Sequence, residues 1–288
     1  MGTGGPGDHE DGPGSYMGHM GHELEHNRIL PQIGVGKDIS TTIVLSSQAN
    51  LQMMTWLEEE DARITGKVFF FHQDGTPMPV RVNGQEASSE FAFQVNPSEM
   101  VFLEITSDGP NTPGWSLIAV DDQEMGQDWG MRDGHAVFRG ERLIATAFYT
   151  VTGAEGELIS RVGVIPAMYE RDHFFNSALV ALFGENVNTG VAIVNTNSET
   201  VPLQTRLIDS AGQEVAVSPF SLPAGNQTAL FIDQLFPGSV PESFQGSLEV
   251  TTSEEGVVVM GLLMTHDILT SMPAHHFGNW EQGGSMMP

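Results

Sequence analysis

Short apolar runs of strand length follow one another from residue 29 onward, and Gly, Pro, Asn and Asp separate them at regular intervals. The clearest runs, all rich in β-branched and aromatic residues, are 41–45, 66–71, 91–95, 101–105 and 115–120. Such residues favour strands over helices. Asp74-Gly75 and Asn83-Gly84 tolerate positive φ and predict tight turns. The pattern predicts an all-β chain built as a sandwich or a barrel.

One stretch departs from this pattern. In residues 50–63 the apolar residues Leu51, Met54 and Leu57 recur at helical spacing behind Asn50, which is a candidate N-cap. This spacing predicts a short helix inserted between two strands.

The order of strands and turns occurs twice along the chain. The aligned segments are 29–35 with 178–182, 66–80 with 203–215, 91–105 with 220–232, 114–120 with 246–250, and 143–148 with 257–262. Each series ends near a proline, Pro166 in the first and Pro273 in the second. Four or more landmarks in one order indicate an internal duplication.

The duplication predicts two tandem β-sandwich domains, Ig-like or jelly-roll-like, with extended tails at both ends. The expected boundaries are a Gly/His-rich tail at 1–28, a first sandwich at 29–168, a second at 169–276, and a C-terminal tail at 277–288. The first sandwich carries insertions at 50–63 and 121–141. Long loops on a sandwich are common places for function.

The net charge and the composition exclude several classes of binding partner and site. The 288 residues include 37 acidic and 11 basic side chains, a formal net charge of −26, and the segment 172–288 holds a single base, Arg206. A field of this sign repels nucleic acid, because nucleic-acid binding needs a positive patch. The chain has no cysteine and no apolar run long enough for a membrane span, so disulfides, thiolate sites and a spanning helix are not expected.

The first residues lack the basic start and apolar core of a signal peptide. The acidic, cysteine-free, β-rich remainder favours an extracellular or cell-surface setting, in which this chain would begin at a processed mature end. Alone, the Gly-rich tail buries too little apolar surface to offset the entropy of ordering it.

A cluster of histidines in this tail provides the candidate chemistry. His22, Glu23 and His26 form an H-E-x-x-H string, the pattern in which zinc proteases place two ligands and a general base on one helix face. Here the string lies in a Gly-rich tail with no upstream sheet, so we expect no enzyme, and a zinc-dependent hydrolase is the remote alternative. No cofactor is expected to be required. His19, His22 and His26 could still bind Cu or Zn, and the acidic loops could bind Ca²⁺.

Several apolar residues are candidates for contacts between copies. Open sheet edges accept an extended strand from a neighbour, and a head-to-tail contact of this kind produces a filament. The candidates in the tails and insertions are Leu24, Ile29, Ile33, Trp56, Trp129, Phe277 and Trp280. Two alternatives stay open: residues 29–35 could pair within their own domain, and the two insertion tryptophans could cover the sandwich ends.

Several turn and strand motifs carry a family resemblance. They are Pro31-Gln32-Ile33, residues 71–77 (FHQDGTP), 188–195 (NTGVAIVN), 221–225 (SLPAG), 235–238 (LFPG) and 244–248 (FQGSL). With them, residues 29–276 resemble secreted bacterial proteins built from paired β-sandwich repeats. The resemblance implies the fold and an extracellular setting, and it brings no catalytic residues. We therefore expect a structural subunit of a fibre, filament or surface layer that assembles with itself, and the alternative is a secreted metal-binding or adhesive module that binds metal ions or a cell-surface ligand.

Overall fold

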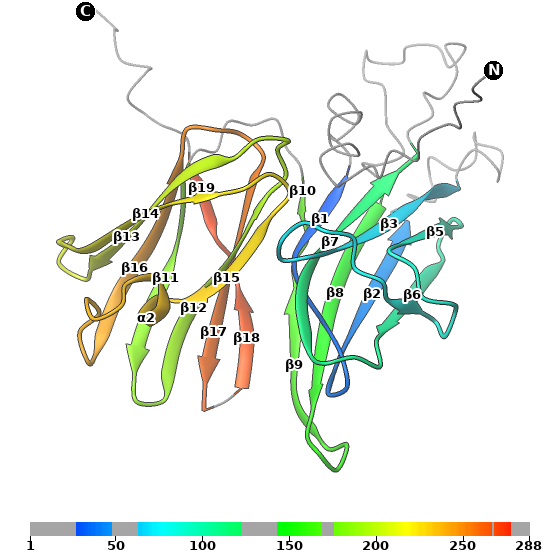
Figure 1. Cartoon of the computed structure of the whole chain (residues 1–288), viewed down its shortest axis with the longest axis horizontal. Helices are drawn as coiled ribbons and strands as arrows, with labels where there is room; N and C mark the ends of the chain where they lie inside the picture. Colours follow the sequence, from blue (N-terminus) through cyan, green and yellow to red (C-terminus); the bar gives the residue numbers. More distant parts are fainter. Residues whose placement is uncertain (1–26, 48–62, 122–142, 169–175, 267, 278–288) are drawn as a thin grey trace, which may run out of the picture.

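The protein is almost entirely antiparallel β-sheet. The computed structural model describes residues 27–47, 63–121, 143–168, 176–266 and 268–277. Figure 1 shows the strands of residues 28–168 on one side of the molecule and those of residues 176–277 on the other. The single described helix, α2 (Ile232–Leu235), has four residues, and no described helix is long and apolar enough to cross a bilayer.

Two five-stranded sheets form the first half. Sheet A has the order β10 (Ala167–Met168), β1 (Arg28–Val35), β7 (Thr112–Val120), β3 (Ile64–His72), β5 (Glu90–Val95). Sheet B has the order β4 (Arg81–Val82), β6 (Met100–Thr106), β2 (Ile39–Ser47), β8 (Leu143–Thr152), β9 (Leu158–Val164). The predicted strands at 41–45, 66–71, 91–95, 101–105 and 115–120 fall within these elements. Asn83, Gly84 and Gly75 have positive φ, as the predicted turns require.

The second half is a nine-stranded sheet that folds over at one hairpin. β11 (Asn176–Gly184) and β12 (Val187–Asn195) pair with each other only beside their turn, through Phe183 with Asn188 and Gly184 with Val187. We therefore describe two layers. Sheet C has the order β19 (His275–Phe277), β11, β16 (Phe244–Thr252), β13 (Val201–Asp209), β14 (Glu214–Leu222). Sheet D has the order β15 (Gln227–Phe231), β12, β17 (Val257–Thr265), β18 (Ile268–Met272).

Strand pairing follows the same plan in both halves. Sheet A and sheet C have equivalent orders, β10-β1-β7-β3-β5 and β19-β11-β16-β13-β14. Sheet B without β4 and sheet D are also equivalent, β6-β2-β8-β9 and β15-β12-β17-β18. The register agrees as well: Phe71 lies opposite Trp115 in the first half, and Ile208 lies opposite Ser247 in the second. The segments aligned in the sequence thus fall on equivalent strands, except that the register matches Phe220 with Phe93 and not with Phe91.

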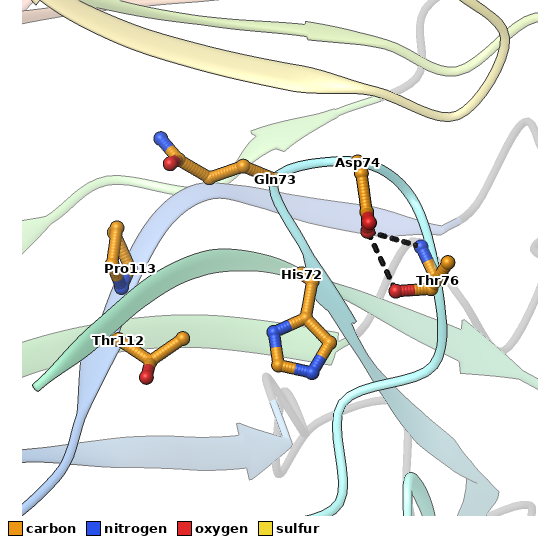
Figure 2. Close-up of a pocket in the computed structure, with 6 residues that line it drawn as sticks. All are labelled: His72, Gln73, Asp74, Thr76, Thr112 and Pro113. Carbon is orange, nitrogen blue, oxygen red and sulfur yellow. Dashed lines mark hydrogen bonds between the residues drawn. The ribbon is translucent and has the colours of Figure 1, made fainter. Parts of the chain in front are cut away.

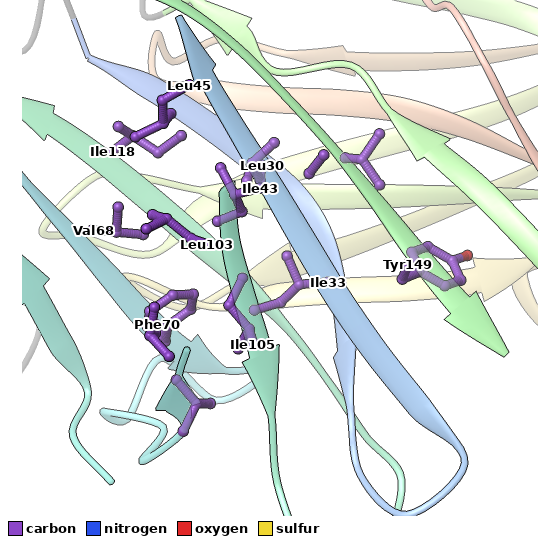
Figure 3. Packing of buried hydrophobic residues seen from close by; sticks show 14 of the residues in the cluster. Leu30, Ile33, Ile43, Leu45, Val68, Phe70, Leu103, Ile105, Ile118 and Tyr149 are labelled. Carbon is purple, nitrogen blue, oxygen red and sulfur yellow. The ribbon is translucent and has the colours of Figure 1, made fainter. Parts of the chain in front are cut away.

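Each half has an apolar core between its two sheets. In the first half, Leu30 and Phe70 of sheet A pack with Ile43 and Ile105 of sheet B (Figure 3). Tyr149 is buried in the same core, and its burial raises the pKa of the phenol well above its usual range. The second core consists mainly of residues on strands of sheets C and D, with Ile232 and Leu235 of α2. Alternate residues of each strand enter these cores, which is the arrangement of a β-sandwich.

A third apolar contact joins the halves, so the sheets stack in the order B, A, D, C. Its members on sheet A are Ile29, Phe69, Phe71, Trp115 and Leu117, and on sheet D they are Val194 and Val258. Strands of sheets A and D are therefore buried on both faces. The unbroken apolar runs 68–71 and 191–194 are typical of such strands, because alternation disappears when neither face meets water.

Candidate functional site

An open depression lies among the described residues, beside the contact between the halves. It has a volume of about 500 Å³ and is lined by His72, Gln73, Asp74, Thr76, Thr112 and Pro113 (Figure 2). His72 is the last residue of β3, the turn after β3 provides the next three residues, and the start of β7 provides Thr112 and Pro113.

Asp74 holds the turn at the rim of this depression. Its carboxylate accepts hydrogen bonds from the Thr76 hydroxyl at 2.6 Å and from the Thr76 backbone N–H at 3.0 Å. These hydrogen bonds stabilise the ionised form and hold the pKa of Asp74 below its usual range, with a smaller contribution from the charge of His72. The carboxylate is thus committed to the local turn.

The depression offers hydrogen-bonding groups rather than a catalytic set. It contains one imidazole, one committed carboxylate, an amide and two hydroxyls. In the ranges that the structure describes, no three His, Asp or Glu side chains gather where they could share a metal ion. The arrangement could bind a small polar ligand through hydrogen bonds.

The backbone beside the depression belongs to the contact between the halves. The Gln227 N–H donates to the Gln73 carbonyl at 2.8 Å, and the Gln227 side chain donates to the Pro31 carbonyl at 3.1 Å. The Trp115 indole N–H donates to the Gly225 carbonyl at 3.1 Å, and its ring stacks on Phe71 with centroids 4.3 Å apart. We call this surface, with the apolar members of sheets A and D described above, the seam.

A second pair of polar groups lies at the end of the described chain. The Ser177 hydroxyl and Nδ1 of His276 are 2.8 Å apart, where β11 pairs with β19. Ser177 is buried and His276 is exposed. The contact ties the last strand to sheet C. The sequence did not indicate it, because the two residues are 99 positions apart.

Most of the residues predicted to bind metal or a neighbouring copy lie outside the described ranges. These are His19, His22, Leu24, His26, Trp56, Trp129 and Trp280. The helix expected at 50–63 also lies almost wholly outside them. Those assignments remain predictions.

The structure places the other candidates within the chain's own sheets. Ile29 and Ile33 of β1 are buried, Ile29 in the seam and Ile33 in the first core. β1 pairs with β7 and β10 of the same chain, which answers the alternative left open for residues 29–35. The two isoleucines are therefore not accessible to a neighbouring copy. Phe277 lies in β19, opposite Asn176 of β11.

The two predicted insertions leave the same end of the first half. Ser47, the last residue of β2, lies opposite Leu143, the first residue of β8. Gly66 of β3 lies opposite Val120, the last residue of β7. The described chain therefore enters and leaves both insertions at one end of sheets A and B.

Comparison with known proteins adds little to this description. No protein-family model matches the chain, and no curated protein matches it. Among solved structures, the chain is similar to procruciferin, an 11S globulin from Brassica napus, with 6% sequence identity and a TM-score of 0.19. That match covers 86% of this chain and 78% of procruciferin. A TM-score this low carries no argument about function.

Proposed function

We propose that the chain is a structural subunit of an extracellular fibre or surface layer, made of two tandem β-sandwich domains and assembled through its terminal tails. The observation that supports the proposal is the duplicated strand pairing together with the apolar seam between the two halves. A rigid building block of this kind suits a mechanical role better than a catalytic one.

Open sheet edges support assembly by strand addition. β5 and β14 are the outermost strands of sheets A and C, and each pairs with a described neighbour on one side. Unpaired N–H and C=O groups on such edges accept an extended peptide. Pro219 within β14 limits how far a partner could pair there, because proline has no N–H to donate. β5 is therefore the better acceptor of the two.

The extracellular setting rests on two sequence features, the resemblance to secreted paired-sandwich proteins and the absence of cysteine in a strongly acidic chain. Like-charged copies repel one another, so contacts between them need apolar or main-chain groups. We expect assembly to strengthen as salt is added, because screening shortens the range of that repulsion to about 8–10 Å at ordinary ionic strength.

Electron microscopy of the purified full chain tests the proposal. The matched variant lacks residues 1–26 but keeps Asn27 and Arg28, because Asn27 Oδ1 accepts from the Val120 N–H and Arg28 donates to the Leu143 carbonyl. A control chain carries residues 1–26 in scrambled order. We expect ordered polymers from the full chain and their loss in the deletion. Polymers that are unchanged by the deletion, or single particles from every chain, would contradict assembly through this tail.

A further inference from the structure

The outer face of sheet B carries an apolar patch that nothing described covers. Met100, Phe102 and Ile144 project from β6 and β8 with 59%, 55% and 47% of their surfaces exposed. They are neighbours across the sheet, because Val44 lies opposite Phe102 and Ser46 lies opposite both Met100 and Ile144. We call these five residues the B-face patch. Contiguous exposed apolar patches commonly mark sites where a protein binds a partner.

The equivalent face of the second half is an interface within the chain. By strand register, Val44 corresponds to Ala192 and Ile144 to Val258, because β2 pairs with β8 as β12 pairs with β17. Ala192 and Val258 are buried, and Val258 packs in the seam with Phe69, Trp115 and other residues of sheet A. The face of sheet D that corresponds to the outer face of sheet B is therefore covered by sheet A of the same chain.

The opposite end of the stack is not suited to cover the B-face patch. On sheet C, Arg206, Ser247 and Glu249 stand where sheet A has Phe69, Trp115 and Leu117. Polar outer faces of this kind terminate repeat stacks. A head-to-tail contact would bury the charges of Glu249 and of Arg206, which lies 3.8 Å from Glu214, against apolar side chains, which is costly. Sheet C also exposes Val180 and Val217, but Val217 lies opposite Arg206, whereas the B-face patch of a second copy bears no charge.

Charge points to the same contact. The chain carries a net charge of −26, so two copies repel over most of their surfaces. The five residues of the B-face patch bear no charge. Glu99 and Glu104 flank them on β6 and its preceding turn, and Arg161 of β9 lies over the Phe148 ring at 4.9 Å, one row further along the sheet. A two-fold contact centred on Ser46 keeps Glu104 and Arg161 at the solvated rim, because Glu104 lies opposite Thr42, two rows along the sheet from Ser46.

We propose that the B-face patch binds the same patch of a second copy, giving a two-fold dimer. Such an interface is self-complementary and closes on itself, so it yields pairs rather than filaments. It uses none of the tail residues. The proposal therefore stands whether or not the chain forms fibres, and in a fibre it would join subunits back to back.

The solution mass of the full chain tests the dimer. We compare wild type with Phe102→Ser/Ile144→Ser and with a control, Val180→Ser/Val217→Ser, which removes exposed apolar side chains from strands of sheet C. At concentrations below the one at which fibres form, sedimentation velocity or light scattering should give twice 31.1 kDa for wild type and control, and 31.1 kDa for the patch variant. Thermal unfolding checks that all three proteins are folded. A monomeric wild type, or a patch variant that stays dimeric, overturns the proposal.

A single cysteine identifies the face that is paired. The chain has no cysteine, so Ser46→Cys introduces one thiol into the B-face patch, and Thr251→Cys introduces one into β16 of sheet C as the control. A bismaleimide cross-linker should join the first variant into a covalent dimer and leave the second monomeric on a denaturing gel, because the backbones of two packed sheets lie about 10 Å apart, too far for a direct disulfide. The reverse pattern overturns the face-to-face contact. The chain lacking residues 1–26 should behave as the full chain does, and loss of its dimer would transfer the contact to the tail and overturn the proposal as well.

Discussion

Sheets A and C have equivalent strand orders, but the residues on their outer faces differ in chemistry. Phe69, Trp115 and Leu117 of sheet A are buried in the seam, whereas Arg206, Ser247 and Glu249 occupy the corresponding positions on sheet C. The strand pairing is therefore independent of what covers the sheet. The residues on one face decide whether a sandwich ends in water or continues into another layer.

Exchanging one residue between these faces gives the largest expected effect. Leu117→Glu places the acid of sheet C into the seam, among the apolar side chains of Ile29, Phe69 and Trp115. An uncompensated buried charge costs about 3–5 kcal/mol. We expect a loss of that order in the free energy of unfolding measured in urea.

The reciprocal exchange provides the control for Leu117→Glu. Glu249→Leu acts on a partly exposed side chain and should change the free energy of unfolding by about 0.5 kcal/mol or less. Equal losses of unfolding free energy in the two variants would mean that adding a charge to the seam costs no more than removing one from the outer face of sheet C.

The polar anchor of the seam should contribute less than its apolar surface. Trp115→Phe keeps an aromatic ring beside Phe71 but removes the N–H that donates to the Gly225 carbonyl. A buried carbonyl left without its donor costs about 1–3 kcal/mol. We expect the urea midpoint to fall accordingly, while Ser247→Ala at the corresponding position of sheet C leaves it nearly unchanged. A midpoint equal to that of wild type would mean that water replaces the indole donor.

The local sequence pattern predicted most of the strands, because the tendency to form a strand depends on the few residues within it. The runs at 41–45 and 115–120 are strands, and Gly75, Asn83 and Gly84 of the two turn dipeptides have the positive φ that was expected. The repeat alignment also placed equivalent strands correctly. Pattern of this kind depends on β-propensity and turn chemistry alone.

The seam was not predicted, because it depends on contacts between distant residues. Trp115 meets Gly225, which is 110 positions away, and no local pattern encodes that pairing. One signal was present: the runs 68–71 and 191–194 do not alternate, which indicates strands buried on both faces. Ile29 and Ile33 were predicted to form contacts between copies. The sequence shows that an apolar side chain is buried, but it does not show which surface buries it.

Two corresponding turns separate backbone strain from seam packing. Gly75 and Gly212 have φ values of 77° and 78° in turns with the same backbone hydrogen bonds. A Cβ on Gly75 would lie 2.7 Å from the Gly225 carbonyl oxygen, whereas a Cβ on Gly212 meets open space. Gly212→Ala should cost about 1 kcal/mol from the left-handed conformation alone.

Gly75→Ala adds a clash across the seam to the same strain, so we expect it to cost about 1 kcal/mol more, in the range of an overpacked contact. Chemical denaturation of the two variants side by side measures the difference. Equal losses would mean that the turn at 224–226 moves aside freely, and that the seam is loosely packed at this point.

The smallest expected effect concerns Asp74, which holds the turn at the edge of the seam. Its pKa is lowered in the folded state, chiefly by the Thr76 hydroxyl, so its ionised form stabilises the fold above the unfolded pKa near 3.8. That contribution is lost as the pH falls through the still lower folded pKa. Asp74→Asn should therefore cost about 1 kcal/mol or less at neutral pH, since the group is exposed and screened. Below pH 3.8 the two proteins should converge in stability.

Asp209→Asn supplies the comparison in the second half, where the carboxylate accepts from the Ala211 and Gln213 N–H groups at 2.8 Å, away from the seam. Thermal unfolding between neutral and acid pH measures both, and a gap between wild type and Asp74→Asn that widens on acidification would contradict the role of the carboxylate.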